Sequence, residues 1–236
     1  MLVPSMTYEE VYRELDRDHD NLQRWWNHQV DNLHRRMIKR DRTAFPVASC
    51  YFHTSPRRIQ YLIIALIGDK RLKWFHTICV AIDGKTVYMY WLNTDSEIRR
   101  MVMLPHMWQR YKERMQFEET GTDIIRRFFC RNFDGSGTKK QEIVARSVRY
   151  NGEEHLSMVV NDGALMGQME GDIFVARTFI TYEMSCGRQQ EEFAKLKHDM
   201  YSPGLEVHPY YRYLPTPDLP PIPKKLLEKI KNENKK

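Results

Sequence analysis

The residues best suited to chemistry lie in one short segment, residues 104–115, where a histidine is followed by two arginines at intervals of four residues. Pro105 suits the first turn of a helix and helix formers follow it, so His106, Arg110 and Arg114 should share one helix face. Histidine side chains titrate near neutrality, and guanidinium groups hold phosphate in bidentate geometry. The spacing predicts a face that binds or cleaves a phosphodiester, and the competing interpretation is an ordinary solvated basic face.

A strand expected over residues 173–182 would supply further groups for orienting a phosphate. Its alternation places Arg177, Phe179 and Thr181 on one face. Thr178 lies on the other face. An arginine and threonine hydroxyls beside a helix with histidine and arginine are suitable partners for phosphate, so we include Arg177, Thr178 and Thr181 among the candidate site residues.

Composition limits the class of protein. The chain has 236 residues, 42% of them hydrophobic, which is typical of a folded globular protein. Its 37 basic and 31 acidic residues permit a polyanionic partner without requiring one. The four cysteines are widely spaced and form no CxxC pair, so we expect no zinc site or disulfide framework, and no cofactor. No apolar run approaches the length of a membrane span, and a cytoplasmic protein without a membrane partner is expected.

The chain begins with a long amphipathic helix, expected over residues 8–39. Thr7 and Glu10 form a capping box at its start, and apolar residues follow at helical spacing. Its other face is rich in arginine, which core packing or docking on a partner helix explains more readily than nucleic-acid contact. Trp25 and Trp26 lie on adjacent sides of the helix and should not both pack on one sheet. One indole is therefore expected to face a partner chain.

Strands and helices alternate after this helix. The expected strands of the first half are 48–53, 59–67, 74–82 and 86–92, with an Asp83-Gly84 hairpin turn before the last. The helix from His106 should end at Gly121, and a second helix, 123–131, should follow Thr122 as its cap. The strands expected in the second half are 143–150, 156–160 and 173–182. A glycine-rich connector at 134–140 and a turn at 162–167 that shapes a site mouth should separate these elements.

The expected fold is therefore α+β. It has a long N-terminal helix, an antiparallel sheet, a central pair of basic helices, a second set of antiparallel strands, a C-terminal helix near 189–200 and a proline-rich arm. We treat residues 1–236 as a single domain. Within it we distinguish a helix-and-strand part at 1–104, a second helix-and-strand part at 105–200, and an extended arm with a lysine-rich tail at 201–236.

The second half resembles the bacterial ribonuclease toxins of the superfamily that groups barnase-like, EndoU, colicin-type and RelE/BrnT-type folds. The resemblance covers about residues 105–182, a third of the chain, and consists of an H-x-x-x-R-x-x-E-R helix, a turn, a short helix and strands that end in Thr-x-Tyr-like residues. The motif specifies only a few residues. Residues 1–104 have no counterpart in a minimal toxin. The matching positions are His106, Arg110, Glu113, Arg114, Gly121, Ile124, Ile125, Thr181 and Tyr182.

This resemblance implies metal-independent RNA cleavage. His106 would act as the general acid or base, and Arg110 and Arg114 would stabilise the charge on the phosphorane. Arg177 with Thr178 or Thr181 would position the phosphate. The expected function is an RNA-binding or RNA-cleaving toxin-like protein, with RNA and an antitoxin-like protein or a second copy as partners. The alternative is a non-enzymatic interaction or oligomerising protein whose basic helix is simply solvated.

Overall fold

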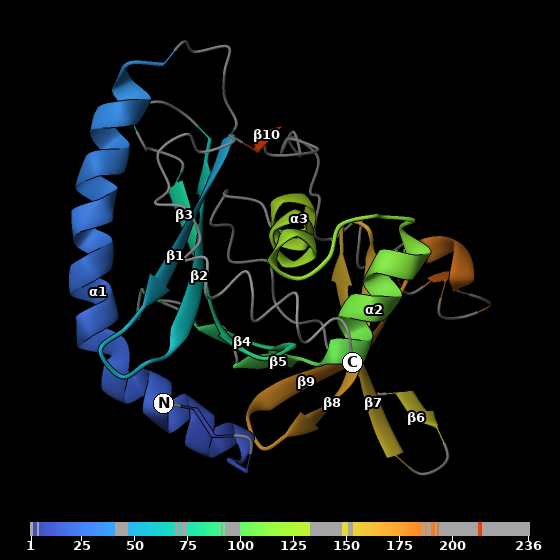
Figure 1. Cartoon of the computed structure of the whole chain (residues 1–236). Coiled ribbons are helices and arrows are strands. Elements are labelled where there is room, and N and C mark those ends of the chain that lie inside the picture. The colour runs from blue at the N-terminus through green and yellow to red at the C-terminus, as the bar shows by residue number, and fades with distance from the viewer. Residues whose placement is uncertain are drawn as a thin grey trace.

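The computed structural model of this chain shows an α+β architecture in which one long helix lies on one face of a mixed sheet and two short helices lie on the other (Figure 1). It describes residues 2–3, 5–40, 47–68, 71, 75–90, 92, 100–132, 148–150, 153–185, 187, 190–191, 193 and 212–213. The helices are α1 (Tyr8–Ile38), α2 (Pro105–Arg114), α3 (Thr122–Asn132) and the short 3-10 helix η2 (Tyr182–Met184). The strands are β1 (Val47–Thr54), β2 (Gln60–Ile67), β3 (Phe75–Asp83), β4 (Thr86–Tyr90), β5 (Met101–Met103), β6 (Val148–Tyr150), β7 (Glu153–Val160), β8 (Gly163–Glu170), β9 (Ile173–Ile180) and β10 (Arg212–Tyr213).

Helix α1 forms where the sequence predicts it, and for the predicted reason. Thr7 accepts the amide hydrogen of Glu10, and the Glu10 carboxylate accepts the amide hydrogen of Thr7 in return. Residues at helical spacing then pack on the sheet, among them Leu15, Leu22 and Leu33, none of which is exposed. Because this apolar stripe spans almost the whole helix, tertiary packing rather than helix propensity holds α1 in place.

The strands form one mixed sheet in the order β10-β1-β2-β3-β4-β5-β9-β8-β7-β6. Eight of them, β1–β5 and β7–β9, make up its body, with the short β6 and β10 at the two ends. Consecutive strands pair antiparallel, but β5 pairs parallel to β9, with Met101 opposite Phe174 and Met103 opposite Ala176. The β5–β9 joint connects the strands of the first half to those of the second. At one end of the sheet the short β10 also pairs parallel, with β1.

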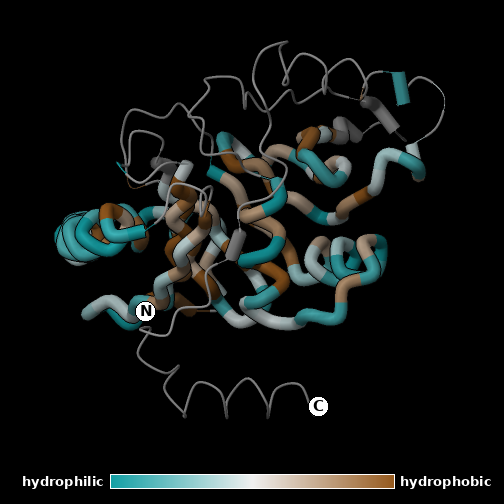
Figure 2. The backbone as a smooth tube through the Cα atoms, turned by 90° about the horizontal axis from the view of Figure 1, so that it is seen from above, coloured by the Kyte–Doolittle hydropathy of each residue, from teal (hydrophilic) through white to brown (hydrophobic). Residues whose placement is uncertain are grey.

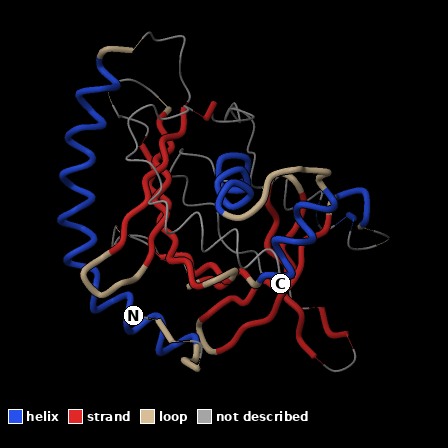
Figure 3. The backbone as a smooth tube through the Cα atoms, in the orientation of Figure 1, coloured by secondary structure: helices blue, strands red, loops and turns tan. Residues whose placement is uncertain are grey.

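Two hydrophobic cores lie on opposite faces of this sheet. Strand β2 contributes to both, because Leu62, Ile64 and Leu66 face α2 and α3 whereas Ile63 and Ala65 face α1. Figure 2 shows the hydrophobic strands between helices whose outer sides are hydrophilic, and Figure 3 shows the same three layers as helix, sheet and helix. Each helix is therefore positioned by the sheet face it covers.

Several expectations need correction. The two sets of strands are fused into one sheet, which is mixed and not purely antiparallel. The segment 162–167, expected to be a turn, contains the start of β8, and only Asn161 and Asp162 turn between β7 and β8. Of the C-terminal helix, residues 190, 191 and 193 are helical. The rest of that helix, the connector at 134–140 and the arm and tail beyond Tyr213 lie outside the described residues.

The two tryptophans of α1 also differ from expectation, since both pack against β1. Trp26 is 3% exposed and meets Tyr51 edge to face, with ring centroids 5.4 Å apart. Trp25 is half-buried and stacks on His53, with centroids 4.2 Å apart and an interplanar angle of 21°. A bare helix leaves the two indoles on adjacent sides, but the twisted edge of the sheet reaches both. Neither indole therefore requires a partner chain.

Candidate functional site

Helix α2 presents its polar residues away from the sheet because its apolar residues fit the core. Pro105 occupies the first turn, and Met107, Trp108 and Tyr111 are buried against β9 and α3. His106 is exposed at the start of the opposite side. The sequence thus predicted the position of this face correctly, from the proline and from the spacing of the apolar residues.

Three polar side chains on the exposed face of α2 contact one another. Arg110 Nε donates to His106 Nε2 over 3.3 Å, and Arg110 Nη1 donates to Glu113 Oε2 over 2.9 Å. Gln109 Nε2 donates to the other carboxylate oxygen of Glu113 over 2.8 Å, and this bond together with Arg110 lowers the pKa of Glu113. A guanidinium only donates hydrogen bonds, so Nε2 of His106 is the acceptor in this contact. We call His106, Arg110 and Glu113 the α2 cluster.

Arg114 makes its hydrogen bond to the sheet and not to the α2 cluster. Its Nη1 donates to the backbone carbonyl of Phe179 on β9. Burial, and then the neighbouring charge of Arg110, lower the pKa of Arg114. The guanidinium therefore ties the end of α2 to the sheet, and only part of its hydrogen-bonding capacity remains for a ligand.

Arg177 lies on the other face of the sheet. Its neighbours on β9, Ile173 and Val175, belong to the core under α1, and Arg177 itself is 3.7 Å from Glu170 in an ion pair. Its charge also acts on the hydroxyl of Tyr8 in α1. The structure therefore does not bring Arg177 to the α2 cluster.

A β-bulge explains why the expected alternation fails at this point. Thr178 pairs with Met166 but Ala176 pairs with Gly167, so Arg177 has no partner residue on β8. Beyond the bulge Phe179 faces α2, where its ring centroid is 4.9 Å from that of Tyr111. Arg177 and Phe179, predicted to share a face, therefore lie on opposite faces.

The two threonines are placed at the end of β9. Thr178 is half-buried beside the bulge, and Thr181 is the residue before η2, where its side chain makes no capping hydrogen bond. The hydrogen bonds of the α2 cluster join His106, Gln109, Arg110 and Glu113 to one another and reach neither hydroxyl. Of the six candidates, the structure joins His106 to Arg110 directly, whereas Arg114 and Arg177 bind other partners.

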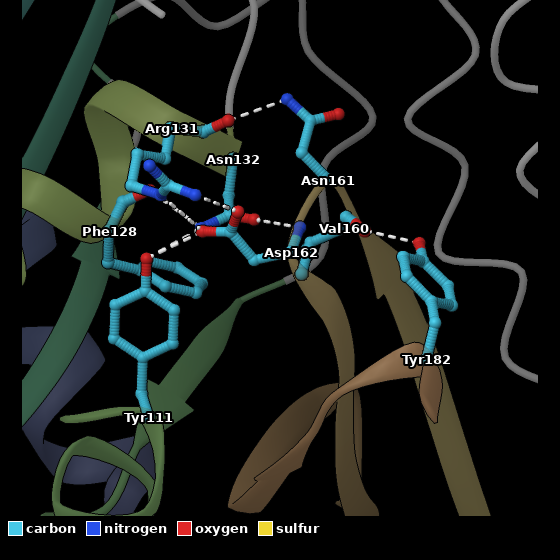
Figure 4. Close-up of polar contacts among 8 residues, drawn as sticks. All are labelled: Tyr111, Phe128, Arg131, Asn132, Val160, Asn161, Asp162 and Tyr182. Atoms are coloured by element: carbon cyan, nitrogen blue, oxygen red, sulfur yellow. Dashed lines mark hydrogen bonds and ion pairs between the residues drawn. The ribbon is translucent and has the colours of Figure 1, made fainter. Parts of the chain in front are cut away.

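A second polar cluster, which the sequence did not indicate, surrounds Asp162 in the β7–β8 turn (Figure 4). Arg131 of α3 donates to both carboxylate oxygens, over 2.8 and 2.7 Å. Tyr111 of α2 donates its hydroxyl hydrogen over 2.7 Å, and Asn132 donates over 3.1 Å. The Asp162 side chain is 5% exposed, so these bonds replace nearly all of its water. We call this group the Asp162 cluster.

The Asp162 cluster joins three elements rather than forming an open site. Asn132 Oδ1 accepts the backbone amide hydrogen of Asp162 over 2.9 Å, and Asn161 donates to the carbonyl of Arg131 over 2.6 Å. Burial, and then the charge of Asp162, raise the pKa of Tyr111, so the hydroxyl stays protonated as a donor. The carboxylate accepts from three residues, so it holds α2, α3 and the β7–β8 hairpin together. In the sequence it was visible only as an Asp-Gly turn signal.

Two further properties concern ligands and membranes. Within the described residues, no group of three or more His, Cys, Asp or Glu side chains is arranged to hold a metal ion. Within the same residues, no helix combines the length and the apolar character needed to cross a membrane.

Comparison with known proteins adds no relative: no family model matches the chain, and neither the curated proteins nor the solved structures show a match.

Proposed function

We propose that this protein binds RNA through the α2 cluster and acts as a metal-independent RNA-binding or RNA-cleaving protein of the toxin-like kind. The observation that carries the proposal is the 3.3 Å contact between Arg110 Nε and His106 Nε2 on an exposed helix face. It supports the proposal because a proton-transfer group and an anion-binding group lie at one place, next to solvent.

The proposed step needs the Nε2 lone pair of His106, so Arg110 Nε must leave this nitrogen and turn to the phosphate. His106 then takes the proton of the RNA 2′-hydroxyl, whose oxygen attacks the adjacent phosphorus. A 2′,3′-cyclic phosphate forms, the bond from phosphorus to the 5′-oxygen breaks, and the 5′-oxygen takes a proton from the imidazolium or from water. Arg110 beside His106 is suited to the negative charge that develops on the phosphate oxygens. Glu113 accepts a hydrogen bond from Nη1 of Arg110 and so orients the guanidinium group. His106 is thus the proposed base and Arg110 the proposed anion-stabilising group.

The test uses purified protein, labelled total RNA and single-turnover conditions, with and without a chelator. His106→Ala should lower cleavage by about 10²- to 10⁴-fold while RNA binding changes little, because only the proton transfer is lost. Arg110→Lys should lower both cleavage and binding, since a point charge does not replace a planar fork. Chelator should leave cleavage by the wild-type protein unchanged.

The matched control is Lys85→Gln, which removes one exposed positive charge at the β3–β4 turn and should leave cleavage and binding unchanged. Thermal melting of all variants checks that each is folded. Unchanged cleavage in folded His106→Ala contradicts the catalytic role, and unchanged RNA binding in folded Arg110→Lys contradicts the α2 site.

A specific observation supports the alternative function, that of a non-enzymatic interaction protein. Arg110 is already paired with Glu113, and Arg114 already donates to Phe179 O, so the arginines of α2 are engaged within the protein. In this case α2 is a solvated helix, and the partner is an antitoxin-like protein or a second copy of the chain. The absence of any RNA cleavage or binding, together with a concentration-dependent dimer in light scattering, would favour this alternative.

A further inference from the structure

The outward face of α1 carries a regular stripe of basic residues. Arg24, His28, Arg35 and Lys39 are all exposed and lie at intervals of four, seven and four residues, so they share one side of the helix. This side is opposite the apolar stripe that packs on the sheet, so it faces away from the sheet. Figure 1 shows α1 lying along one face of the sheet. We call these four residues the α1 stripe.

The two arginines of the stripe belong to a short internal repeat. The sequence Asp-Asn-Leu-x-Arg occurs at 20–24 and again at 31–35. A shift of eleven residues is close to three helical turns, so the two copies have nearly the same orientation and lie about 16 Å apart along the axis. Leu22 and Leu33 are correspondingly both fully buried.

Both copies fix the arginine side chain in the same way. Arg24 Nε donates to the carbonyl of Asp20 over 3.1 Å, and its Nη2 donates to Asn21 Oδ1 over 2.8 Å. Arg35 makes the equivalent bonds to the carbonyl of Asp31 over 3.3 Å and to Asn32 Oδ1 over 3.2 Å. No ion pair joins either arginine to a carboxylate within the described residues. In each case Nη1 keeps both of its hydrogens for a ligand, on a guanidinium whose orientation is already set.

Charge is separated along the helix. Residues 21–40 contain five lysines and arginines and one acid, whereas residues 8–20 contain six acids and two arginines. Basic residues near the end of a helix interact favourably with its dipole, which accounts for the last turn. Arg24 is nearly four turns before the end at Ile38, so the dipole does not account for it.

The outward face of α1 has almost no exposed apolar residues, and this indicates the kind of ligand that it could bind. Every exposed residue of α1 from Glu9 to Arg35 is polar or charged, and only Ile38 is an exposed large hydrophobic residue. A protein interface has an apolar centre, whereas a phosphate backbone is recognised by charge and by hydrogen-bond donors. We propose that the α1 stripe binds the phosphate backbone of RNA, with Arg24 and Arg35 contacting phosphates about three helical turns apart.

This binding surface is separate from the α2 cluster. α1 covers one face of the sheet and α2 the other, as the two hydrophobic cores and Figure 1 show. The α1 stripe would hold RNA independently of sequence, since backbone contacts carry no base information. The inference goes beyond the proposed function of α2, and variants on the two helices distinguish them.

The experiment measures binding of a fluorescein-labelled single-stranded RNA by anisotropy over a range of salt, with a matched RNA duplex as a second probe. Arg24→Gln/Arg35→Gln removes two phosphate contacts. The slope of log affinity against log salt should then become shallower by about 1.4 for the single strand. If wild type and variant bind equally at 1 M salt, this corresponds to about 25-fold weaker binding at 0.1 M.

The control variant Arg58→Gln/Lys85→Gln removes the same charge from exposed positions outside α1, in the β1–β2 and β3–β4 connections, and should leave the slope nearly unchanged. Arg24→Lys/Arg35→Lys should leave most of the salt dependence of binding in place but lower the affinity for RNA. The positive charges remain in this variant, whereas the oriented, planar guanidinium groups are lost. Unaltered affinity and slope in a folded Arg24→Gln/Arg35→Gln protein overturn the inference, and so does an equal loss in the control variant. If the wild type binds neither probe, both RNA proposals fail. If Arg110→Lys weakens binding and Arg24→Gln/Arg35→Gln does not, only the α2 site stands.

Discussion

Asp162 is the residue whose carboxylate links α2 and α3 to the β7–β8 turn. Its carboxylate accepts hydrogen bonds from Nε and Nη2 of Arg131. The side chain of Asp162 is 5% exposed and that of Arg131 is 21% exposed. Asp162→Asn removes the negative charge and leaves a largely buried guanidinium without its counter-ion. Because Arg131 keeps some contact with water, we expect a loss of about 2–4 kcal/mol in the free energy of unfolding. Urea denaturation followed by tryptophan fluorescence measures it.

The same substitution at an exposed position is the control. The side chain of Asp172 in the β8–β9 turn is 70% exposed, and its carboxylate is 3.9 Å from Arg100. Asp172→Asn should therefore change stability by less than about 0.5 kcal/mol. Equal effects of Asp162→Asn and Asp172→Asn would show that the Asp162 cluster does not hold α2 in place.

At the residue scale, local signals were predictable and contacts between distant segments were not. The Thr7 capping box and the shared face of His106 and Arg110 each depend on residues three or four positions apart. The Asp162 cluster joins residues from three elements, and nothing near Asp162 in the sequence identifies Arg131 or Tyr111 as its partners. Arg177 was misplaced because a bulge, which has no simple sequence signal, reverses the alternation.

At the scale of elements, β8 depends on a glycine that allows close approach to β9. A Cβ atom at Gly167 would lie 2.0 Å from the carbonyl oxygen of Val175, which is backbone and has no room to move. Gly167→Ala must therefore push the two strands apart at the bulge. We expect a loss of about 3 kcal/mol or more, measured by urea denaturation.

Gly84 in the β3–β4 turn gives the comparison for this change. Its φ is +58° and a Cβ atom there would meet nothing within 4 Å, so Gly84→Ala costs only the backbone strain of about 1 kcal/mol. If Gly167→Ala costs no more than Gly84→Ala, the close approach of β8 and β9 is not a constraint on the fold.

These glycines also explain why the β3–β4 hairpin was predicted correctly from the sequence and β8 was not. The Asp83-Gly84 pair marked a true hairpin turn, and the strands on either side were correctly predicted. In β8 the same residue type permits close contact within a strand, so a glycine-rich stretch was assigned to a turn. The Asp-Asn-Leu-x-Arg repeat of α1 was not predicted from the sequence, because it is short and lies within one helix. The structure shows the same hydrogen bonds at both arginines.

At the scale of the whole molecule, the joint between β5 and β9 connects the two halves of the chain in one sheet. The register of two parallel strands far apart in the sequence has no local signal, so the sequence indicated two sets of strands but not their fusion. The core under α2 and α3 contains residues of both halves, including Leu62 and Ile64 from β2 and Phe174 and Phe179 from β9. Each half alone would expose this core to water.

We therefore expect the chain to unfold in one cooperative transition. Cutting it between Leu104 and Pro105 would separate Met101–Met103 from their partners Phe174–Ala176 and divide the core, so neither fragment, 1–104 nor 105–236, should fold alone. Calorimetry of the intact protein should give equal calorimetric and van't Hoff enthalpies, and the amide spectra of both fragments should be poorly dispersed. Mixing the fragments should restore the dispersion, because the β5–β9 pairing and the shared core can re-form between chains. Two separate transitions, or a fragment that folds independently, would mean that the sheet joins two units that are stable by themselves.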